Sequence, residues 1–270
     1  MTRTTPARSA TPGPDPVEAP APAPVAAGPD PAGAGAPLAF STRGLHARLT
    51  APGAETPLRE ETLVVNLSAE PLDLGTERPS QVAPLQSAVL DRVTLRHPAP
   101  LLLLTGLRTE RIDGLGAREG WLRIGNDPAV AAGAGEGEPF PAATPLWRSP
   151  IAQLGTVTLP PHLLGAPSEA RTPVPLRLQA NLWYAPAGTD CHIHRRHDFL
   201  EVHAQVAGRG RMQKFHAQDA RTRYQDVALE PGSTHAPFCG YDATGTWSYP
   251  WHRYWADTDC VWLALEYHPC

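Results

Sequence analysis

A dense group of histidines lies in the C-terminal half of this 270-residue chain. Four of its eleven histidines fall within twelve residues of the stretch 191–208, CHIHRRHDFLEVHAQVAG, with a glutamate among them. Imidazole and carboxylate are the ligands that borderline divalent metals prefer. We therefore predict a metal site, completed by a fifth histidine in the later segment PGSTHAPFC. The predicted ligands are His192, His194, His197, Glu201 and His235.

A β-strand can bring such side chains together, because residues two apart in a strand point to the same face. His192 and His194 can thus aim at one ion, as can Glu201 and His203. Three neutral histidines and one carboxylate leave coordination positions open for water, oxygen or substrate. These ligand types suit Fe(II), Mn(II), Ni(II), Cu(II) or Zn(II) and do not select among them.

The composition argues against several other classes of protein. A formal net charge of −4 and a pI near 6.2 lack the basic footprint of a nucleic-acid-binding protein. The four cysteines form no CxxC pair, which argues against a zinc ribbon or a thioredoxin-like motif. No secretory signal is visible, and no apolar run approaches the roughly 20 residues that span a bilayer. We predict a cytoplasmic protein with a small-molecule substrate and neither a nucleic-acid nor a membrane partner.

The pattern along the chain predicts three parts. Residues 1–37 hold ten prolines and little to bury, so we predict a disordered Pro/Ala-rich tail. Residues 38–150 contain short alternating or apolar runs broken by Pro, Gly, Asn or Asp, which predict a β domain without a ligand cluster. Residues 151–270 contain nine of the eleven histidines and a second set of such runs, with a bridging segment or short helix at its start. No long amphipathic helix is evident, so the predicted fold class is all-β.

The histidine stretch resembles the first signature of the cupin superfamily. That signature is a glycine, five residues, HxH, three or four residues, a glutamate, six residues and a glycine. Gly188 is followed after five residues by His194, and Glu201 is followed after six by Gly208. The resemblance covers about residues 174–268, and it implies two cupin-like double-stranded β-helix (jelly-roll) barrels, of which the N-terminal one is degenerate. Because cupins commonly pair through sheet edges, it also implies a homodimer.

The second cupin signature includes a Pro-x-Gly turn followed after two residues by a histidine. Gly232 is followed after two residues by His235, and Pro231 stands directly before that glycine. Cys239 takes the position where the family often has asparagine. By this resemblance His235 is a metal ligand.

The first signature leaves two registers open, because its second histidine would fall strictly at Arg196. In one register His192 and His194 are the paired ligands. In the other, His194 and His197 take these positions, and three residues then separate His197 from Glu201. His194 serves in both registers.

Two residues near the predicted ligands are candidates for contact with a substrate or with the ligands themselves. His203 stands two residues after Glu201 and is either a donor behind the ligands or a packing residue. Lys214, the only lysine of the chain, can bind a substrate carboxylate, as can Arg211. If Met212 faces the barrel core, Lys214 shares its face and Arg211 does not.

Three further candidates are Cys239, Trp251 and His252. Cys239 either tunes the metal or is simply a small buried residue. Trp251 and His252 belong to an aromatic segment, TWSYPWHRYW at 246–255, which we read as a loop. Such a loop forms either a lid over a pocket or a hydrophobic cover over one barrel end.

The resemblance implies a metal-dependent cupin enzyme, and we expect an oxygenase or other oxidoreductase with Fe(II) as the favoured metal. Its substrate would be a small organic acid, an amino acid or a natural-product intermediate. Two alternatives remain open from the sequence: a metal-dependent isomerase or epimerase, and a non-catalytic cupin that binds a small molecule.

Overall fold

The computed structural model describes residues 35–76, 80–106, 112–127, 140–167, 170–242 and 244–270. Within these ranges the regular elements are strands and short 3-10 turns, and no α-helix occurs. The all-β prediction is therefore confirmed. The predicted disordered tail lies outside the described residues except for its last three positions.

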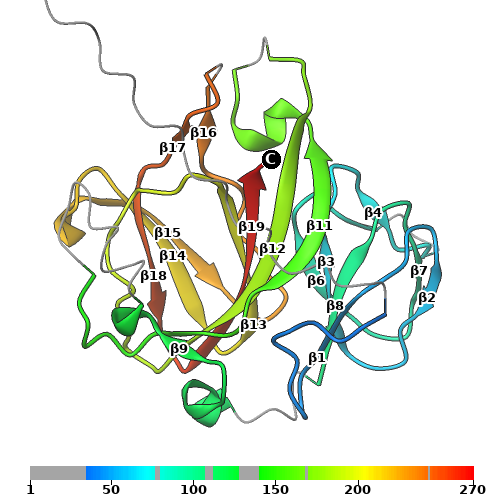
Figure 1. Ribbon diagram of the computed structural model, residues 1–270, viewed down its shortest axis with the longest axis horizontal. Helices are drawn as coiled ribbons and strands as arrows, with labels where there is room; N and C mark the ends of the chain where they lie inside the picture. The colour runs from blue at the N-terminus through cyan, green and yellow to red at the C-terminus, as the bar shows by residue number, and fades with distance from the viewer. Residues whose placement is uncertain (1–34, 77–79, 107–111, 128–139, 168–169, 243) are drawn as a thin grey trace, which may run out of the picture.

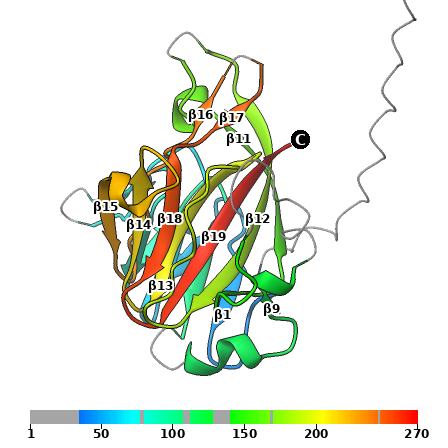
Figure 2. The same cartoon turned by 90° about the vertical axis from the view of Figure 1, so that its left-hand side faces the viewer.

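Two antiparallel sheets form the main part of the C-terminal half (Figure 1, Figure 2). The larger sheet has the order β13-β19-β12-β10-β9, and β11 also pairs with β12. The smaller sheet has the order β15-β14-β18. The strands of the larger sheet are β9 (Leu122–Arg123), β10 (Trp147–Arg148), β11 (Ala152–Leu159), β12 (Val174–Ala185), β13 (Leu200–Ala207) and β19 (Cys260–Pro269). Those of the smaller sheet are β14 (Gly210–Phe215), β15 (Arg223–Leu229) and β18 (Trp251–Ala256).

The N-terminal half is a smaller set of sheets beside the larger C-terminal one (Figure 1). Its main sheet has the order β1-β8-β3-β6, and two strand pairs, β2-β7 and β4-β5, accompany it. The strands are β1 (His46–Leu49), β2 (Glu55–Pro57), β3 (Thr62–Asn66), β4 (Leu72–Asp73), β5 (Gln81–Val82), β6 (Ser87–Leu90), β7 (Thr94–Arg96) and β8 (Leu101–Thr105). The remaining short elements are η1 (Ile112–Ala117), η2 (Ile124–Asn126), η3 (Pro161–Leu164), η4 (Ala220–Thr222), β16 (Gly240–Tyr241) and β17 (Trp247–Ser248).

Strand β13 shows how the fold positions the histidines. Leu200 and Val202 belong to the hydrophobic cluster shared with the N-terminal half, where Leu63 and Leu102 also lie. Glu201 and His203 alternate with them and are buried as well. Because strand side chains alternate between faces, apolar packing against the N-terminal half turns the polar side chains of β13 toward the smaller sheet. There His203 stacks on Tyr254 of β18, at 4.1 Å between ring centroids.

Two segments form strands that the sequence interpretation did not predict. The aromatic segment read as a loop contains β17 and β18, and β18 pairs with β14 along its whole length. Its burial alternates residue by residue, as expected for a strand with one face inward. The segment read as a bridge or short helix forms β11, and only its last residues form the 3-10 turn η3.

The last strands of the predicted N-terminal domain belong to the larger C-terminal sheet. Strands β9 and β10 fall within residues 38–150, yet they pair with one another and through β10 with β12 of the larger C-terminal sheet. The two halves further share one hydrophobic cluster. The three-part division of the chain thus remains a prediction.

The backbone conformation at Gly208, the last residue of the first cupin-like signature, requires a glycine. It has a φ of +72°, and a Cβ at this position would overlap the Asp259 carbonyl oxygen. We expect Gly208→Ala to lower the free energy of unfolding by about 2 kcal/mol or more, because the left-handed conformation and the overlap both cost energy. Urea unfolding measures this loss. Gly188→Ala is the matched control, since Gly188 has a φ of +79° and a Cβ there would meet nothing within 4 Å; equal losses in both variants would contradict the overlap argument.

Candidate metal centre

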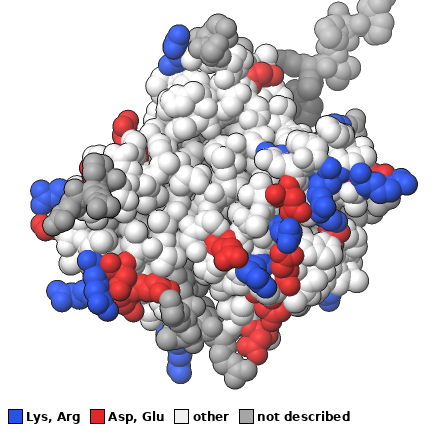
Figure 3. Space-filling model, turned by 180° about the vertical axis from the view of Figure 1, so that it is seen from behind, with Lys and Arg blue, Asp and Glu red and all other residues white. Residues whose placement is uncertain are grey.

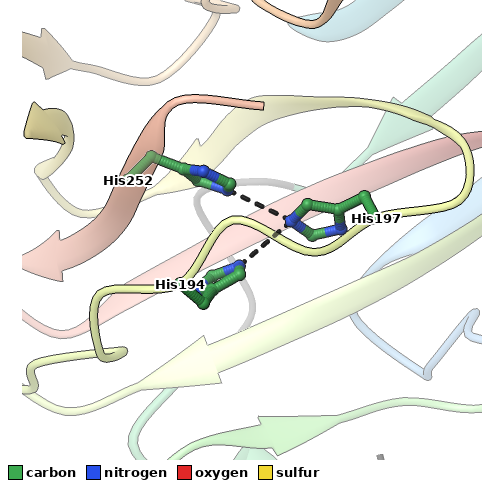
Figure 4. A group of neighbouring side chains, drawn as sticks. All are labelled: His194, His197 and His252. Carbon is green, nitrogen blue, oxygen red and sulfur yellow. Dashed lines mark hydrogen bonds between the residues drawn. The ribbon is translucent and has the colours of Figure 1, made fainter. Parts of the chain in front are cut away.

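Three histidine side chains meet between the two C-terminal sheets (Figure 4). His194 and His197 come from the segment before β13, and His252 comes from β18. The Nε2 atom of His197 lies 3.1 Å from the Nε2 atom of His194 and 3.1 Å from that of His252. The potential ligand atoms of all three residues lie within 4.8 Å of one another. Residues far apart in the sequence thus form a single cluster of ring nitrogens.

Backbone hydrogen bonds hold two of these histidines opposite each other. The His194 N–H donates to the His252 carbonyl at 2.9 Å, and the His252 N–H donates to the His194 carbonyl at 2.8 Å. Residues in such a reciprocal antiparallel pair carry their side chains on the same face. The two imidazole rings consequently lie only 4.4 Å apart between centroids.

The other ring nitrogen of each paired histidine contacts a backbone carbonyl. His194 Nδ1 lies 3.0 Å from the His192 carbonyl oxygen, and His252 Nδ1 lies 2.9 Å from the Pro250 carbonyl oxygen. A carbonyl can only accept, so each Nδ1 carries the proton and donates it. Each Nε2 therefore presents a lone pair toward His197 Nε2. A single proton on His197 cannot form a good hydrogen bond with both, whereas a cation satisfies all three nitrogens.

The spacing of the nitrogens suits a metal ion. With metal–nitrogen distances of about 2.1 Å, two ligands lie about 3.0 Å apart at 90° and about 3.4 Å apart at the tetrahedral angle. The two nitrogen–nitrogen distances of 3.1 Å fall within this interval. The donor set and its spacing thus fit a divalent metal ion.

The protonation state also favours a cation. Burial lowers the pKa of His197 to about 4, lowers that of His194, and lowers that of His252 well below its ordinary value. Burial disfavours the charged imidazolium, so all three rings are neutral near pH 7. Neutral imidazole is the form that binds metal.

Glu201 adds a carboxylate beside the three histidines. Its Oε2 lies 3.9 Å from His197 Nε2, and its Oε1 lies 3.1 Å from His203 Nε2. Burial by itself would raise the pKa of this carboxyl, but the neighbouring His203 outweighs it and holds the pKa well below its usual range. An ionised carboxylate therefore stands next to the nitrogens, where it offsets the charge of a bound cation.

His192 and His235, both predicted ligands, have other partners. His192 Nε2 lies 2.8 Å from the Thr144 hydroxyl, and only its carbonyl reaches the site, as the acceptor for His194. His235 Nε2 accepts from the His203 N–H at 3.0 Å and lies 2.7 Å from the Tyr254 hydroxyl, while its Nδ1 lies 3.0 Å from the Ala236 carbonyl oxygen. The cluster thus contains His194 and His197 from the predicted ligands together with His252, whereas the His192 and His235 rings lie outside it.

The remaining predicted residues occupy distinct places. His203 lies behind Glu201, and Lys214 lies on the inner face of β14, opposite His252 in the strand register. Cys239 lies in the large hydrophobic cluster, where burial raises its pKa to about 11, so its thiol is not a ready metal ligand. Trp251 points to the face opposite His252 and stacks with the Arg195 guanidinium at 4.6 Å.

His252 is the member of the histidine cluster that the sequence interpretation undervalued, because it treated this residue as a loop histidine. The signal that identifies it is the alternation in WHRYWA, where His252, Tyr254 and Ala256 are buried and the residues between them are half-buried. Because both sets contain aromatic residues, hydrophobicity alone does not reveal which set faces inward.

Comparisons with known proteins do not assign this chain to a family. No family model and no curated protein matches the chain. Among solved structures, the ectoine synthase from P. lautus is 15% identical, with 34% of this chain and 55% of that chain covered and a TM-score of 0.25. Structures of DMSP lyases RdDddP and RnDddQII match at 17% identity, 48% and 50% coverage and a TM-score of 0.26. The match thus spans about half the length of these two proteins.

A mutant of Bacillus subtilis oxalate decarboxylase OxdC is 11% identical, with 84% of this chain and 70% of that chain covered and a TM-score of 0.30. Another structure of that enzyme is described by its Mn(II) centres. The all-β architecture and the three clustered histidines agree with the resemblance of the sequence to cupins. With TM-scores of 0.30 or lower, these structural matches carry no argument about this chain.

Within the described ranges, no helix has the length and apolar character that a bilayer crossing demands.

Proposed function

We propose that this protein is a mononuclear metal-dependent enzyme whose metal is held by His194, His197 and His252, with Glu201 beside them. The observation that carries the proposal is the meeting of three neutral Nε2 atoms, two of them with the opposite nitrogen committed to a backbone carbonyl. Fixing the tautomer from behind is how proteins prepare histidines for a metal.

An enzyme is favoured over a purely structural metal site by the ligand count. Structural zinc sites are closed by four protein ligands, whereas catalytic sites keep a position open for water or substrate. Three histidines supply three ligands here, and Glu201 does not belong to the group of potential ligand atoms that all lie within 4.8 Å of one another. When bound, the metal would supply a Lewis acid and a binding position for a substrate oxygen.

The chain's own residues would orient and screen this centre. The His192 and Pro250 carbonyls hold the ring planes of His194 and His252. The Glu201 carboxylate can accept a proton, and the His203 imidazole lies 3.1 Å from it. Tyr249 fixes the backbone here, since its hydroxyl accepts from the Glu201 N–H at 3.0 Å and donates to the Phe199 carbonyl at 2.8 Å.

The finer proposal is an Fe(II)-dependent oxygenase or other oxidoreductase that acts on a small organic acid or a related metabolite. Nitrogen-rich sites with open positions suit Fe(II), and also Mn(II), Ni(II), Cu(II) and Zn(II). Elemental analysis of the purified protein, followed by anaerobic reconstitution with each metal and measurement of O₂ uptake over a panel of organic acids, tests it.

We expect close to one metal ion per chain and O₂ uptake that depends on Fe(II). Metal binding without O₂ uptake, together with isomerised product, would replace the oxygenase with an isomerase. A protein that binds no metal after reconstitution would overturn the enzyme proposal altogether.

A further inference from the structure

The only lysine of the chain lies on the same inner face as the metal-site histidine of β18. Lys214 and His252 are direct partners in the β14–β18 register. Met212, two residues before Lys214, belongs to the core cluster between the sheets, as expected for residues that share a face. Arg211, on the other face, bonds to Asp257.

Phe238 links the lysine to the metal site. The Lys214 Nζ atom lies 4.7 Å from the centre of the Phe238 ring, and the His252 ring centre lies 4.9 Å from the same point. The ammonium and the His252 ring therefore lie at most about 10 Å apart, with an aromatic surface between them. A ligand of a few carbon atoms can span such a distance.

Lys214 has no counter-ion in the part of the chain that the structure describes. No ion pair joins it to a carboxylate, and burial lowers its pKa with no acidic neighbour to offset the effect. The arginines on the other face of this sheet differ, since Arg211 pairs with Asp257, and Arg253 with Asp190. Figure 3 shows such mixing of basic and acidic side chains on the molecular surface. A half-buried ammonium without an anion is costly unless a ligand supplies one.

Other buried polar atoms face the same interior. Asn181 is fully buried, and its Nδ2 donates to Glu266 at 2.8 Å, while its Oδ1 has no hydrogen-bond partner among the described residues. The same holds for Nδ1 of His203. Nearly all buried polar atoms in folded proteins have a partner, so this interior is suited to a polar ligand.

We propose that Lys214 is the anchor for a substrate carboxylate and that the substrate is a short carboxylic acid, bound with its anion on Nζ and its other end at the metal. The inference rests on the proposed metal-dependent function and narrows its substrate class. A carboxylate fits better than a phosphate, because one ammonium supplies one charge and phosphate sites in proteins usually add arginines or several backbone N–H groups.

The test measures binding of malonate, succinate and neutral malonamide to Zn(II)-loaded protein by calorimetry, with the metal content of every sample determined. We expect at least one of the two dicarboxylates to bind and malonamide not to. Lys214→Met should weaken dicarboxylate binding about tenfold to a hundredfold, the range of a charge-assisted hydrogen bond. Lys214→Arg should keep most of the affinity, and Arg211→Gln, on the other face of the same strand, should keep all of it.

A second measurement uses the unaltered protein, so that no variant has to fold. Reductive methylation should modify Lys214, the single lysine, and the dicarboxylate that binds should protect it, as read by peptide mass spectrometry. Unchanged binding in metal-loaded Lys214→Met, or no protection, would overturn the carboxylate anchor while leaving the metal site intact. A parent protein that takes up no Zn(II) would overturn the proposed function and the anchor together.

Discussion

Replacing His252 with alanine should remove the metal from the purified protein and weaken its affinity for added Zn(II) by at least about a hundredfold. The change deletes one of three converging nitrogens, and disturbing even a residue behind a metal ligand costs tenfold to a hundredfold. His252 Nε2 lies 3.1 Å from His197 Nε2, and its backbone pairs with His194. Alanine keeps that backbone pairing, so the loss reports on the imidazole.

The informative control is His192→Ala. The His192 ring bonds to Thr144 and not to the cluster, and the carbonyl that accepts from His194 survives the substitution. We expect this variant to keep its metal, as measured by competition with a chromophoric chelator. Metal loss in His192→Ala with retention in His252→Ala would reverse the assignment and favour the other register of the sequence signature.

Acidification should destabilise the metal-free protein steeply between pH 6.5 and pH 4. Burial lowers the pKa of both His197 and His235 to about 4, whereas in the unfolded chain histidine titrates near 6.5. In this interval the unfolded chain binds protons that the folded chain does not, so the free energy of unfolding falls as the pH falls. The neutral histidines contribute their full share to the free energy of unfolding above pH 6.5. His235 alone accounts for a loss of about 3 kcal/mol by pH 4.

Urea unfolding in the presence of a chelator at pH 7, 6, 5 and 4.5 measures this slope. His235→Gln removes one titrating group, so its slope should be shallower by up to about 1.4 kcal/mol per pH unit, even though the variant is less stable at pH 7 because the His203 N–H and Tyr254 hydroxyl lose their acceptor. A stability that stays flat from pH 7 to pH 4.5 would show that the buried histidines do not titrate as argued.

Much of the fold follows from local pattern. Short apolar runs separated by Pro, Gly, Asn or Asp predicted strands in both halves of the chain, and the described residues of both halves contain them. A strand needs only alternation and local propensity to be recognised. Strand β18 was not recognised because aromatic residues occur on both of its faces, Trp251 and Trp255 on one and Tyr254 on the other, so no uniformly polar face marks the period.

The sequence by itself determined that the chain is all-β, that histidines of the C-terminal half are suited to a metal, and that Lys214 shares a face with Met212. These conclusions depend on residue type and on spacings of a few residues. Only the tertiary structure decided which histidines meet, because His252 lies 55 residues from His197 in the chain and reaches it through the pairing of β18 with β14 and with the His194 segment. Ligand convergence is a property of strand pairing across long separations, and no local spacing encodes it.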